Sequence, residues 1–232
     1  MERNKRLRES LADSDVFGAL TDEEVDRLVT YGNPVRHSRN HVIFQKGEPG
    51  DSLMVVLSGR VKISNVSAEG KEALLNFIEP GHSFGELAMF DGKPRSADAT
   101  AAEPSELFVL RRADVLTFLE RHPEIAFRII GILCERVRRT SELLEESVTL
   151  NMPTRLARML LRLAKIYGKS YSDGIHIELK LSQRELGSYV GLARENINRQ
   201  LAIWRNDGIA SIEDGIIVLH DARALERIAA AG

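Results

Sequence analysis

The sequence of 232 residues predicts an α+β protein that combines a β-roll, one long helix and a C-terminal winged helix-turn-helix. Short runs of alternating apolar and polar residues, separated by glycines, fill residues 35–109 and indicate the β-roll. Apolar residues then recur at alternating steps of three and four along residues 123–150, which is typical of a long helix. Near the C-terminus, two short helical segments flank Gly191 and precede a hairpin signal, which predicts the winged helix-turn-helix.

Composition restricts the class of protein further. With 43% hydrophobic and 28% charged residues, the chain resembles an ordinary soluble globular protein. We find no signal peptide and no apolar run long enough to cross a bilayer, so we expect a cytoplasmic protein without a membrane partner. The single cysteine, Cys134, excludes an intramolecular disulfide and an iron–sulfur cluster held only by thiolates. The six histidines form no ligand pair that predicts a metal site, although haem ligation stays open.

The first half of the chain predicts two helices followed by short strands. The helices are expected over residues 2–14 and 21–31, and Thr21 with Glu24 forms a capping box at the start of the second. The glycines that follow stand at positions 47, 59, 70 and 81, at steps of 12, 11 and 11 residues. Short strands with turn signals at such steps are typical of a sandwich or barrel, here a roll of the jelly-roll type.

The β-rich region is interrupted at residues 84–100, FGELAMFDGKPRSADAT. A short helix starting at Glu86 would present free backbone N–H groups, and Gly85 would let the backbone approach a ligand closely. Arg95 supplies a fork that matches two phosphate oxygens, and Ser96 adds a hydroxyl donor. Because the carboxylate of Glu86 repels phosphate, its role would be to accept a hydrogen bond from a ribose hydroxyl. The pattern therefore predicts a nucleotide site, with an internal Glu86–Arg95 ion pair as the alternative.

The central region predicts a short helix over residues 114–120 and a long one that begins near Pro123. The long helix carries a narrow stripe with the 3-4-3-4 spacing of a coiled-coil seam: Ile130, Leu133, Val137, Thr140 and Leu144. Charged residues crowd its other faces, which favours a two-helix homodimer over a single amphipathic helix packed on its own domain. A hydroxyl at Thr140 is unusual on such a seam, so it is either a tolerated polar residue or a functional group.

The C-terminal third predicts a helix over residues 154–167, a turn-rich loop over 168–174 and a strand over 176–181. Residues 152–232 carry 12 Lys and Arg against 9 Asp and Glu, a net charge of +3 that is compatible with nucleic acid but weak evidence alone. A helix then starts near Ser182, where Glu185 completes a capping box, and a second helix spans residues 193–205.

The second of these helices has two distinct faces. Ile197, Leu201 and Trp204 are spaced for a buried face. The other face holds side chains that suit base edges, namely Arg194, Glu195, Asn198 and Arg199. A solvated helix face with charge pairs is the alternative. The Asp214-Gly215 hairpin signal and a closing helix over residues 221–230 favour a winged helix that binds DNA.

The order of these segments, over about residues 15–220, is similar to that of bacterial transcription regulators of the cyclic AMP receptor protein and fumarate–nitrate regulator family. GELAMFDGKPRSA resembles the phosphate-binding cassette of its cyclic-nucleotide-binding domains, and ARENINR resembles part of its helix-turn-helix. The chain is most similar to the cyclic AMP receptor protein branch, of the Clr type. The resemblance implies a cyclic-nucleotide-binding domain over residues 1–122, a dimerisation helix and hinge over 123–151, and a DNA-binding domain over 152–232.

The same resemblance implies specific partners and contacts. A homodimer would bind cyclic AMP, with cyclic GMP as the open alternative, then a palindromic double-stranded DNA operator and RNA polymerase. The residues matched to nucleotide contacts are Gly85, Glu86, Leu87, Arg95, Ser96, Arg136, Thr140 and, from the partner subunit, Ser141. Those matched to DNA contacts are Ser182, Gln183, Arg194, Glu195, Asn198 and Arg199. Gln183 stands where the family often has arginine, which implies the loss of one contact, and residues 196–198 can change the half-site preference.

Three other interpretations are compatible with parts of the sequence. The first is a regulator of the same fold with another effector or none. The second is a cyclic-nucleotide-regulated subunit that acts on a protein partner, which the face of Arg194, Glu195 and Arg199 argues against. The third is an enzyme such as a phosphodiesterase with Glu86 as base, but the sequence has no metal-ligand cluster and no nucleophile–base pair, so we predict no enzyme activity.

Overall fold

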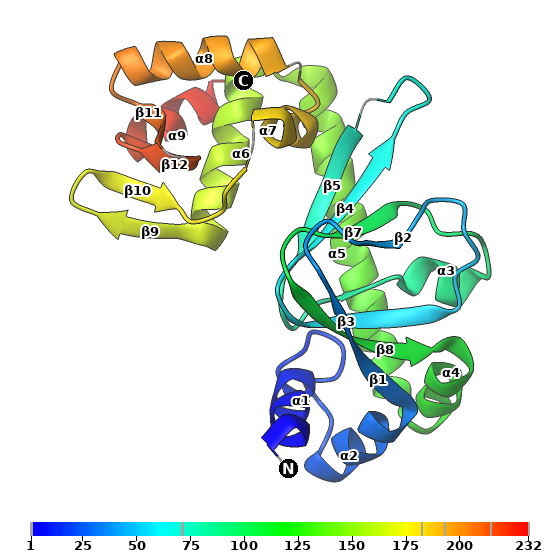
Figure 1. The fold of residues 1–232 in the computed structure, drawn as a ribbon. Coiled ribbons are helices and arrows are strands. Elements are labelled where there is room, and N and C mark those ends of the chain that lie inside the picture. The colour runs from blue at the N-terminus through cyan, green and yellow to red at the C-terminus, as the bar shows by residue number, and fades with distance from the viewer. Residues whose placement is uncertain (1, 71, 182, 193, 214, 232) are drawn as a thin grey trace. The chain divides into compact units, whose positions relative to one another are not determined.

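The computed structural model describes residues 2–70, 72–181, 183–192, 194–213 and 215–231, and Figure 1 labels its elements. The chain divides into two compact units, Met1–Val137 and Arg138–Gly232. The boundary between them falls inside the long helix α5 (Pro123–Thr149). The domain limits that we predict at residues 122 and 151 therefore stay a prediction.

The first unit contains two four-stranded antiparallel sheets, in agreement with the predicted β-roll (Figure 1). Their strand orders are β1-β8-β3-β6 and β2-β7-β4-β5. The strands are β1 (Gly32–His37), β2 (Val42–Phe44), β3 (Ser52–Ser58), β4 (Val61–Val66), β5 (Glu72–Ile78), β6 (Ser83–Phe84), β7 (Asp98–Ala101) and β8 (Ser105–Arg111). The four glycines that separate the predicted runs all have positive φ and lie between successive strands, so the turn signals were read correctly.

Successive side chains of β3 point to opposite faces of the sheet and contribute to two separate core clusters of this unit. Leu53 and Val55 belong to a cluster with the helices, whereas Met54 and Val56 belong to a cluster shared by the two sheets. The helices of the first unit are α1 (Glu2–Ala12), α2 (Asp22–Tyr31), α3 (Glu86–Asp91) and α4 (Arg112–Arg121), together with the start of α5. The capping box at the start of α2 is confirmed, since the Thr21 amide donates to Glu24 Oε2 at 2.8 Å.

Helix α5 corrects the predicted seam. Leu133 is partly buried against the core of the first unit, so it does not belong to an exposed stripe. The large apolar side chains of α5 that are 53–78% exposed are Phe127, Ile130, Val137, Leu144 and Val148. With Cys134 and Ser141 between them, these residues follow alternating steps of three and four along α5. The predicted stripe had Leu133 and Thr140 at the corresponding positions. An apolar residue fits either the core or a seam, so the sequence pattern alone did not separate the two faces.

Among its described residues, the second unit contains the end of α5, four further helices and one four-stranded antiparallel sheet of order β11-β12-β10-β9. Its helices α7 and α8 confirm the predicted helix-turn-helix. The helices are α6 (Met152–Tyr167), α7 (Gln183–Val190), α8 (Arg194–Asn206) and α9 (Ala222–Ala230). The strands are β9 (Gly168–Tyr171), β10 (Gly174–Ile177), β11 (Ala210–Glu213) and β12 (Ile216–Leu219). Two expectations were wrong here, because the predicted loop 168–174 holds strand β9 and the strand predicted over 176–181 ends at Ile177. All four residues of β9 are exposed, so its backbone pairing with β10 left no apolar pattern to detect.

Candidate ligand site and nucleic-acid interface

The predicted cassette folds as a strand, a left-handed turn and a short helix. Strand β6 ends at Phe84, Gly85 adopts φ 83°, and α3 begins at Glu86 as predicted. A Cβ on Gly85 would lie 2.7 Å from Arg95 Nη1 and 3.0 Å from the Ser52 carbonyl oxygen. Both the backbone conformation and the close contact therefore require glycine at this position.

Arg95 turns inward and is only 5% exposed. Its Nη1 donates to the carbonyl oxygens of Gly85 at 2.7 Å and Ser52 at 3.1 Å, and its Nη2 donates to Ser52 Oγ at 2.8 Å. The guanidinium also lies over the ring of Phe44, 4.3 Å from its centroid. Burial lowers the pKa of Arg95, and the negative charges of Asp51, Glu86 and Glu48 oppose that effect.

The carboxylate of Glu86 pairs with Arg136 of α5. Glu86 is 5% exposed, and its Oε1 accepts a hydrogen bond from Arg136 Nη1 at 2.7 Å. Arg136 Nη2 also donates to the carbonyl oxygen of Ser83 at 2.5 Å. The alternative of an internal Glu86–Arg95 ion pair is thus replaced by a Glu86–Arg136 pair, which joins the cassette to α5 within the first unit.

The remaining predicted nucleotide contacts are distributed along the surface. Ser96 is exposed next to the buried Arg95, and Leu87 is exposed on α3. Thr140 and Ser141 are exposed on α5 in the second unit, whereas the cassette belongs to the first unit, so their predicted contacts stay a prediction. Three cassette contacts were not predicted, because Ser52, Phe44 and Ser83 are ordinary strand residues with no motif signal of their own.

Asp15, between α1 and α2, is a half-buried carboxyl that bonds to Ser83 beside the cassette. Its Oδ2 accepts a hydrogen bond from the Ser83 amide at 3.3 Å, and its Oδ1 is buried without a hydrogen-bond partner in the described part of the chain. Burial raises the pKa of Asp15, although the Ser83 amide and the charges of His82 and Arg136 partly oppose the increase.

We expect Asp15→Asn to stabilise the protein near neutral pH. Because the pKa of Asp15 is raised in the folded state, its contribution to stability is greatest below the ordinary carboxyl pKa and is lost as pH rises through the raised value. Asparagine removes the buried charge and still accepts from the Ser83 amide. Thermal unfolding from pH 4 to 8 should show a variant that melts a few degrees higher at pH 8, with the difference shrinking toward pH 4. Parallel curves for the two proteins would contradict this assignment.

The predicted nucleic-acid face lies on α8. Ile197, Leu201 and Trp204 are buried as predicted, and Gln200 joins them. Arg194, Glu195 and Arg199 are exposed, and Arg199 Nη2 donates to Asn196 Oδ1 at 3.3 Å. Asn198 is half-buried, and its Oδ1 is buried without a hydrogen-bond partner among the described residues, so only part of this side chain can reach a base.

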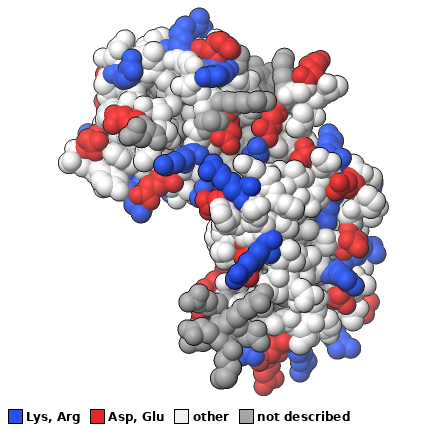
Figure 2. Space-filling model, in the orientation of Figure 1, with Lys and Arg blue, Asp and Glu red and all other residues white. Residues whose placement is uncertain are grey.

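The turn between α7 and α8 explains how the two helices are held. Gly191 adopts φ 70°, and the Leu192 amide donates to the carbonyl oxygen of Gly187 at 2.8 Å. Gln183 is half-buried at the start of α7, whereas the predicted contact at Ser182 lies outside the described residues. Figure 2 shows basic and acidic side chains interspersed over the visible face, so net charge by itself does not mark a nucleic-acid surface.

Comparison with known proteins shows the family of the chain. The model of the cyclic nucleotide-binding domain matches residues 34–122, and the model of the Crp-like helix-turn-helix domain matches residues 154–228. The chain is 32% identical to the CRP-like cAMP-activated global transcriptional regulator of Mycobacterium tuberculosis over 221 residues, 95% of this chain and 99% of the relative. The chain belongs to the Crp/Fnr family. This Crp/Fnr protein is therefore a DNA-binding transcription regulator with a cyclic-nucleotide-binding domain, as predicted.

Two further relatives show the range of the family. The chain is 30% identical to the cyclic AMP receptor protein of Thermus thermophilus over 216 residues, 93% of this chain and 97% of the relative. A solved structure of the c-di-GMP-responsive global regulator CLP from Xanthomonas campestris has a TM-score of 0.78 and 23% identity, covering 87% of this chain and all of that chain. The second likeness shows the fold alone. These relatives are regulators and not enzymes, which confirms the prediction that this chain is not an enzyme.

Within the described residues, no helix is both long and apolar enough to cross a membrane. No three side chains of His, Cys, Asp or Glu come together there as a set that could hold a metal ion.

Proposed function

We propose that this regulator responds to a cyclic nucleotide bound at the cassette of the first unit, with cyclic AMP as the expected effector. The observation that carries the proposal is the buried guanidinium of Arg95, whose hydrogen bonds go to two carbonyl oxygens and one hydroxyl. Burying a cation is costly unless it is paired. The carboxylates of Asp51, Glu86 and Glu48 act on Arg95 only through space, and an anionic phosphate would be a charged partner bonded directly to it.

The donors of Arg95 fit a phosphate. Of the five N–H groups of an arginine, the bonds to Gly85 and Ser52 use three. The Nε atom is buried without a hydrogen-bond partner in the described part of the chain. Together with the second N–H of Nη2, it forms one edge of the fork, the arrangement that binds two phosphate oxygens at once. Gly50 packs against this edge, since a Cβ there would lie 2.7 Å from Arg95 Nε.

The ion pair between Glu86 and Arg136 suggests how binding would reach α5. A ribose hydroxyl that donates to Glu86 competes with Arg136 for the same buried carboxylate. Arg136 could then turn to the phosphate, the position that its family resemblance implies. A ligand shifts a conformational equilibrium only through contacts that differ between the states, and Arg136 provides such a contact.

We assign recognition of the purine base to side-chain hydroxyl groups. Thr140 would contact the base from its own subunit and Ser141 from the partner subunit, and a hydroxyl can both donate and accept. Thr140 can therefore meet the amino group of adenine or the carbonyl of guanine. Ser96, exposed beside Arg95, could add a contact to guanine, which keeps cyclic GMP as a second candidate.

We further propose that the exposed stripe of α5 is the seam of a homodimer. It contains Phe127, Ile130, Cys134, Val137, Ser141, Leu144 and Val148, at the alternating steps of three and four that two-stranded coiled coils require. A row of exposed apolar side chains on one helix is unfavourable in water. Pairing of α5 with the same helix of a second copy would bury these side chains. Ser141 on this seam fits its assigned contact to the nucleotide of the partner subunit.

The native cysteine gives a direct test of this seam. Cys134 is a free, exposed thiol at one of its positions, and in a parallel pair it faces Cys134 of the partner subunit. A disulfide needs Cα atoms within about 7 Å, a distance that opposed seam residues can reach. Mild oxidation should therefore convert most of the protein to a disulfide-linked dimer on a non-reducing gel. As a matched control, the double variant Cys134→Ser, Arg138→Cys moves the thiol off the seam and should stay monomeric on the gel. Equal cross-linking of both proteins would contradict the register.

The second unit would then place two recognition helices on a two-fold symmetric operator. Half-sites about 34 Å apart match the repeat of the major groove. The exposed face of Arg194, Glu195 and Arg199 is proposed to read the bases. Contact with RNA polymerase and a cytoplasmic location are further parts of this proposal, supported by the family alone.

Titration of the nucleotide-free protein by calorimetry tests the proposal. We expect cyclic AMP to bind near one molecule per subunit and to raise affinity for a DNA operator, with cyclic GMP measured separately. The competing proposal, a regulator with another effector or none, is favoured by the likeness to a c-di-GMP-responsive regulator of the same fold. No heat with either cyclic mononucleotide would support that alternative and leave DNA binding unaffected.

A further inference from the structure

The C-terminal half of α5 is bonded to the winged helix at two points. Arg139 Nη2 donates to the hydroxyl of Tyr189 on α7 at 2.5 Å. Two turns further along α5, Glu146 accepts from both terminal nitrogens of Arg162 on α6, at 2.8 and 3.1 Å. Arg158, one turn earlier on α6, lies 3.5 Å from the same carboxylate. Both points of contact lie within the second unit.

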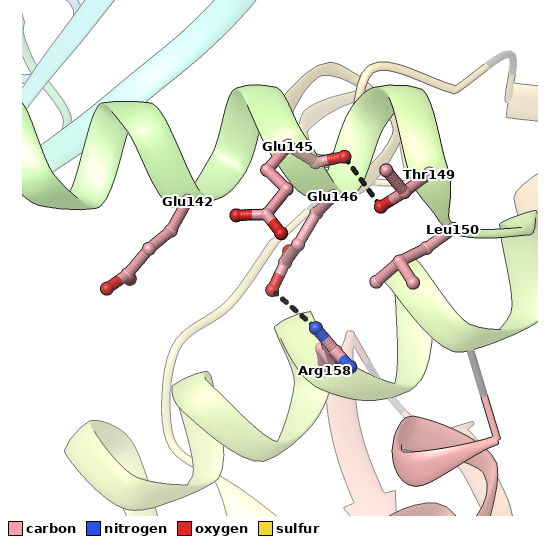
Figure 3. A pocket seen from close by; sticks show the side chains of 6 residues that line it. All are labelled: Glu142, Glu145, Glu146, Thr149, Leu150 and Arg158. Carbon is pink, nitrogen blue, oxygen red and sulfur yellow. Dashed lines mark hydrogen bonds and ion pairs between the residues drawn. The ribbon is translucent and has the colours of Figure 1, made fainter.

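The Glu146 contact is well shielded from water. Its side chain is 13% exposed, so the charge is held between two guanidinium groups in a partly buried position. Figure 3 shows Glu146 pointing toward Arg158 in a pocket of about 510 Å³ that Glu142, Glu145, Thr149 and Leu150 also line. Screening is weaker at such a site than on an open surface, and a two-pronged Arg–carboxylate contact fixes direction as well as distance.

The contacts use the face of α5 that is opposite the proposed dimer seam. Arg139 and Glu146 are seven residues apart, so they share one face of the helix. Leu144 and Val137 each precede one of them by two residues, a rotation of about 200° around the helix. One helix can therefore bind a second copy of the chain and its own winged helix at the same time.

The contacts also span the break between α5 and α6. Asn151 ends the continuity of the two helices, and its Oδ1 caps α6 by accepting from the Thr154 amide at 3.0 Å. Arg155 of α6 in turn donates to the carbonyl oxygen of Val190 at the end of α7. The three helices are thus joined pairwise: α5 to α6 by Glu146, α5 to α7 by Arg139, and α6 to α7 by Arg155.

We propose that Arg139, Tyr189 and Glu146 form a clamp that makes the last three turns of α5 and the winged helix move as one body. Arg139 directly precedes Thr140 and Ser141, the residues assigned to the purine. When the nucleotide displaces α5, the recognition helix α8 then moves with it, although the helix is interrupted at Asn151 between α5 and α6. The clamp residues are positioning residues, and the effector part of this inference rests on the proposed function.

The variant Tyr189→Phe tests the clamp with the smallest possible change. It removes only the hydroxyl that accepts from Arg139. Nucleotide affinity of the DNA-free protein, measured by calorimetry, should stay unchanged, because the lost hydroxyl bonds to Arg139, which is not assigned to the nucleotide. The ratio of DNA affinities with and without cyclic AMP, on an operator selected by the native protein from random duplexes, should fall about tenfold. Tyr171→Phe, which removes a hydroxyl bonded to Glu178 on the β9–β10 hairpin, is the matched control and should keep the native ratio.

Amide hydrogen exchange provides a readout that does not depend on any effector. Tyr189→Phe combined with Glu146→Gln should accelerate exchange across residues 147–153 at the α5–α6 junction, whereas Tyr171→Phe should not. Unchanged exchange at the junction would overturn the clamp even if the native protein responds to cyclic AMP. Accelerated exchange in a protein that ignores both cyclic mononucleotides would support the clamp and reject the effector assignment.

Discussion

Arg95→Ala is expected to weaken cyclic AMP binding by roughly a hundredfold, about 3 kcal/mol, when both proteins are titrated by calorimetry. The substitution removes the only buried cation assigned to the phosphate, together with the two N–H groups on the edge that fits two phosphate oxygens. In the nucleotide-free protein Arg136 is held by Glu86 and by the Ser83 carbonyl, and even when it is released it restores a charge without the donors of Arg95. At a nucleotide concentration that just saturates the native protein, DNA affinity of the variant should therefore be the same with and without nucleotide.

Two controls separate this loss from damage to the fold. Arg36→Ala removes an arginine of β1 whose side chain is 77% exposed and paired only at the surface with Glu106, so nucleotide binding should remain native. Arg95→Lys keeps a positive charge in the site but loses the fork, so it should bind with intermediate affinity if the variant unfolds at the native temperature. A folded Arg95→Ala protein that still responds to cyclic AMP would remove the cassette from the mechanism.

Local signals in the sequence were sufficient for most of the fold. Glycines between the strands, the Thr21 capping box and the turn at Gly191 each depend on a few neighbouring residues, and each was found where predicted. The seam of α5 required non-local information instead. Leu133 is as apolar as Ile130, and only its packing against the first unit's core shows that it does not face a partner. Strand β9 was missed for a similar reason, since its backbone pairing with β10 is independent of its polar side chains.

The residues of the candidate site that belong to a sequence motif could be predicted. The pairing between those residues and distant parts of the chain could not, because it depends on tertiary contacts. Gly85, Glu86 and Arg95 were identified from the residues of the cassette. The structure places them in two hydrogen-bonded groups, Arg95 with Gly85 and Ser52, and Glu86 with Arg136. The choice of Arg136 over Arg95 as partner of Glu86 depends on how α5 packs against the core of the first unit. That packing follows from the whole core of the first unit and leaves no trace in the cassette sequence.

Arg199→Ala in the recognition helix is expected to lower operator affinity by about 2–6 kcal/mol in a symmetric dimer. A side chain that grips a guanine edge contributes about 1–3 kcal/mol, and each of two half-sites loses one such contact. Arg199 is exposed on α8, so its removal leaves the buried face of Ile197, Leu201 and Trp204 intact. Titration against the operator selected by the native protein should show this loss, and thermal unfolding should be unchanged.

The pattern of the loss distinguishes base reading from general attraction to phosphates. A selection from random duplexes with the Arg199→Ala protein should return sites that have lost preference at one position of each half-site, because the missing contact specifies one base. Arg223→Ala removes the same charge from exposed helix α9 and should keep the native preference at every position. Its only expected effect is a small, sequence-independent change that grows weaker as salt is raised, since phosphate contacts carry no sequence information. If both variants lose affinity equally for all duplexes, the exposed face of α8 contributes charge alone, and the base-reading surface must lie elsewhere in the second unit.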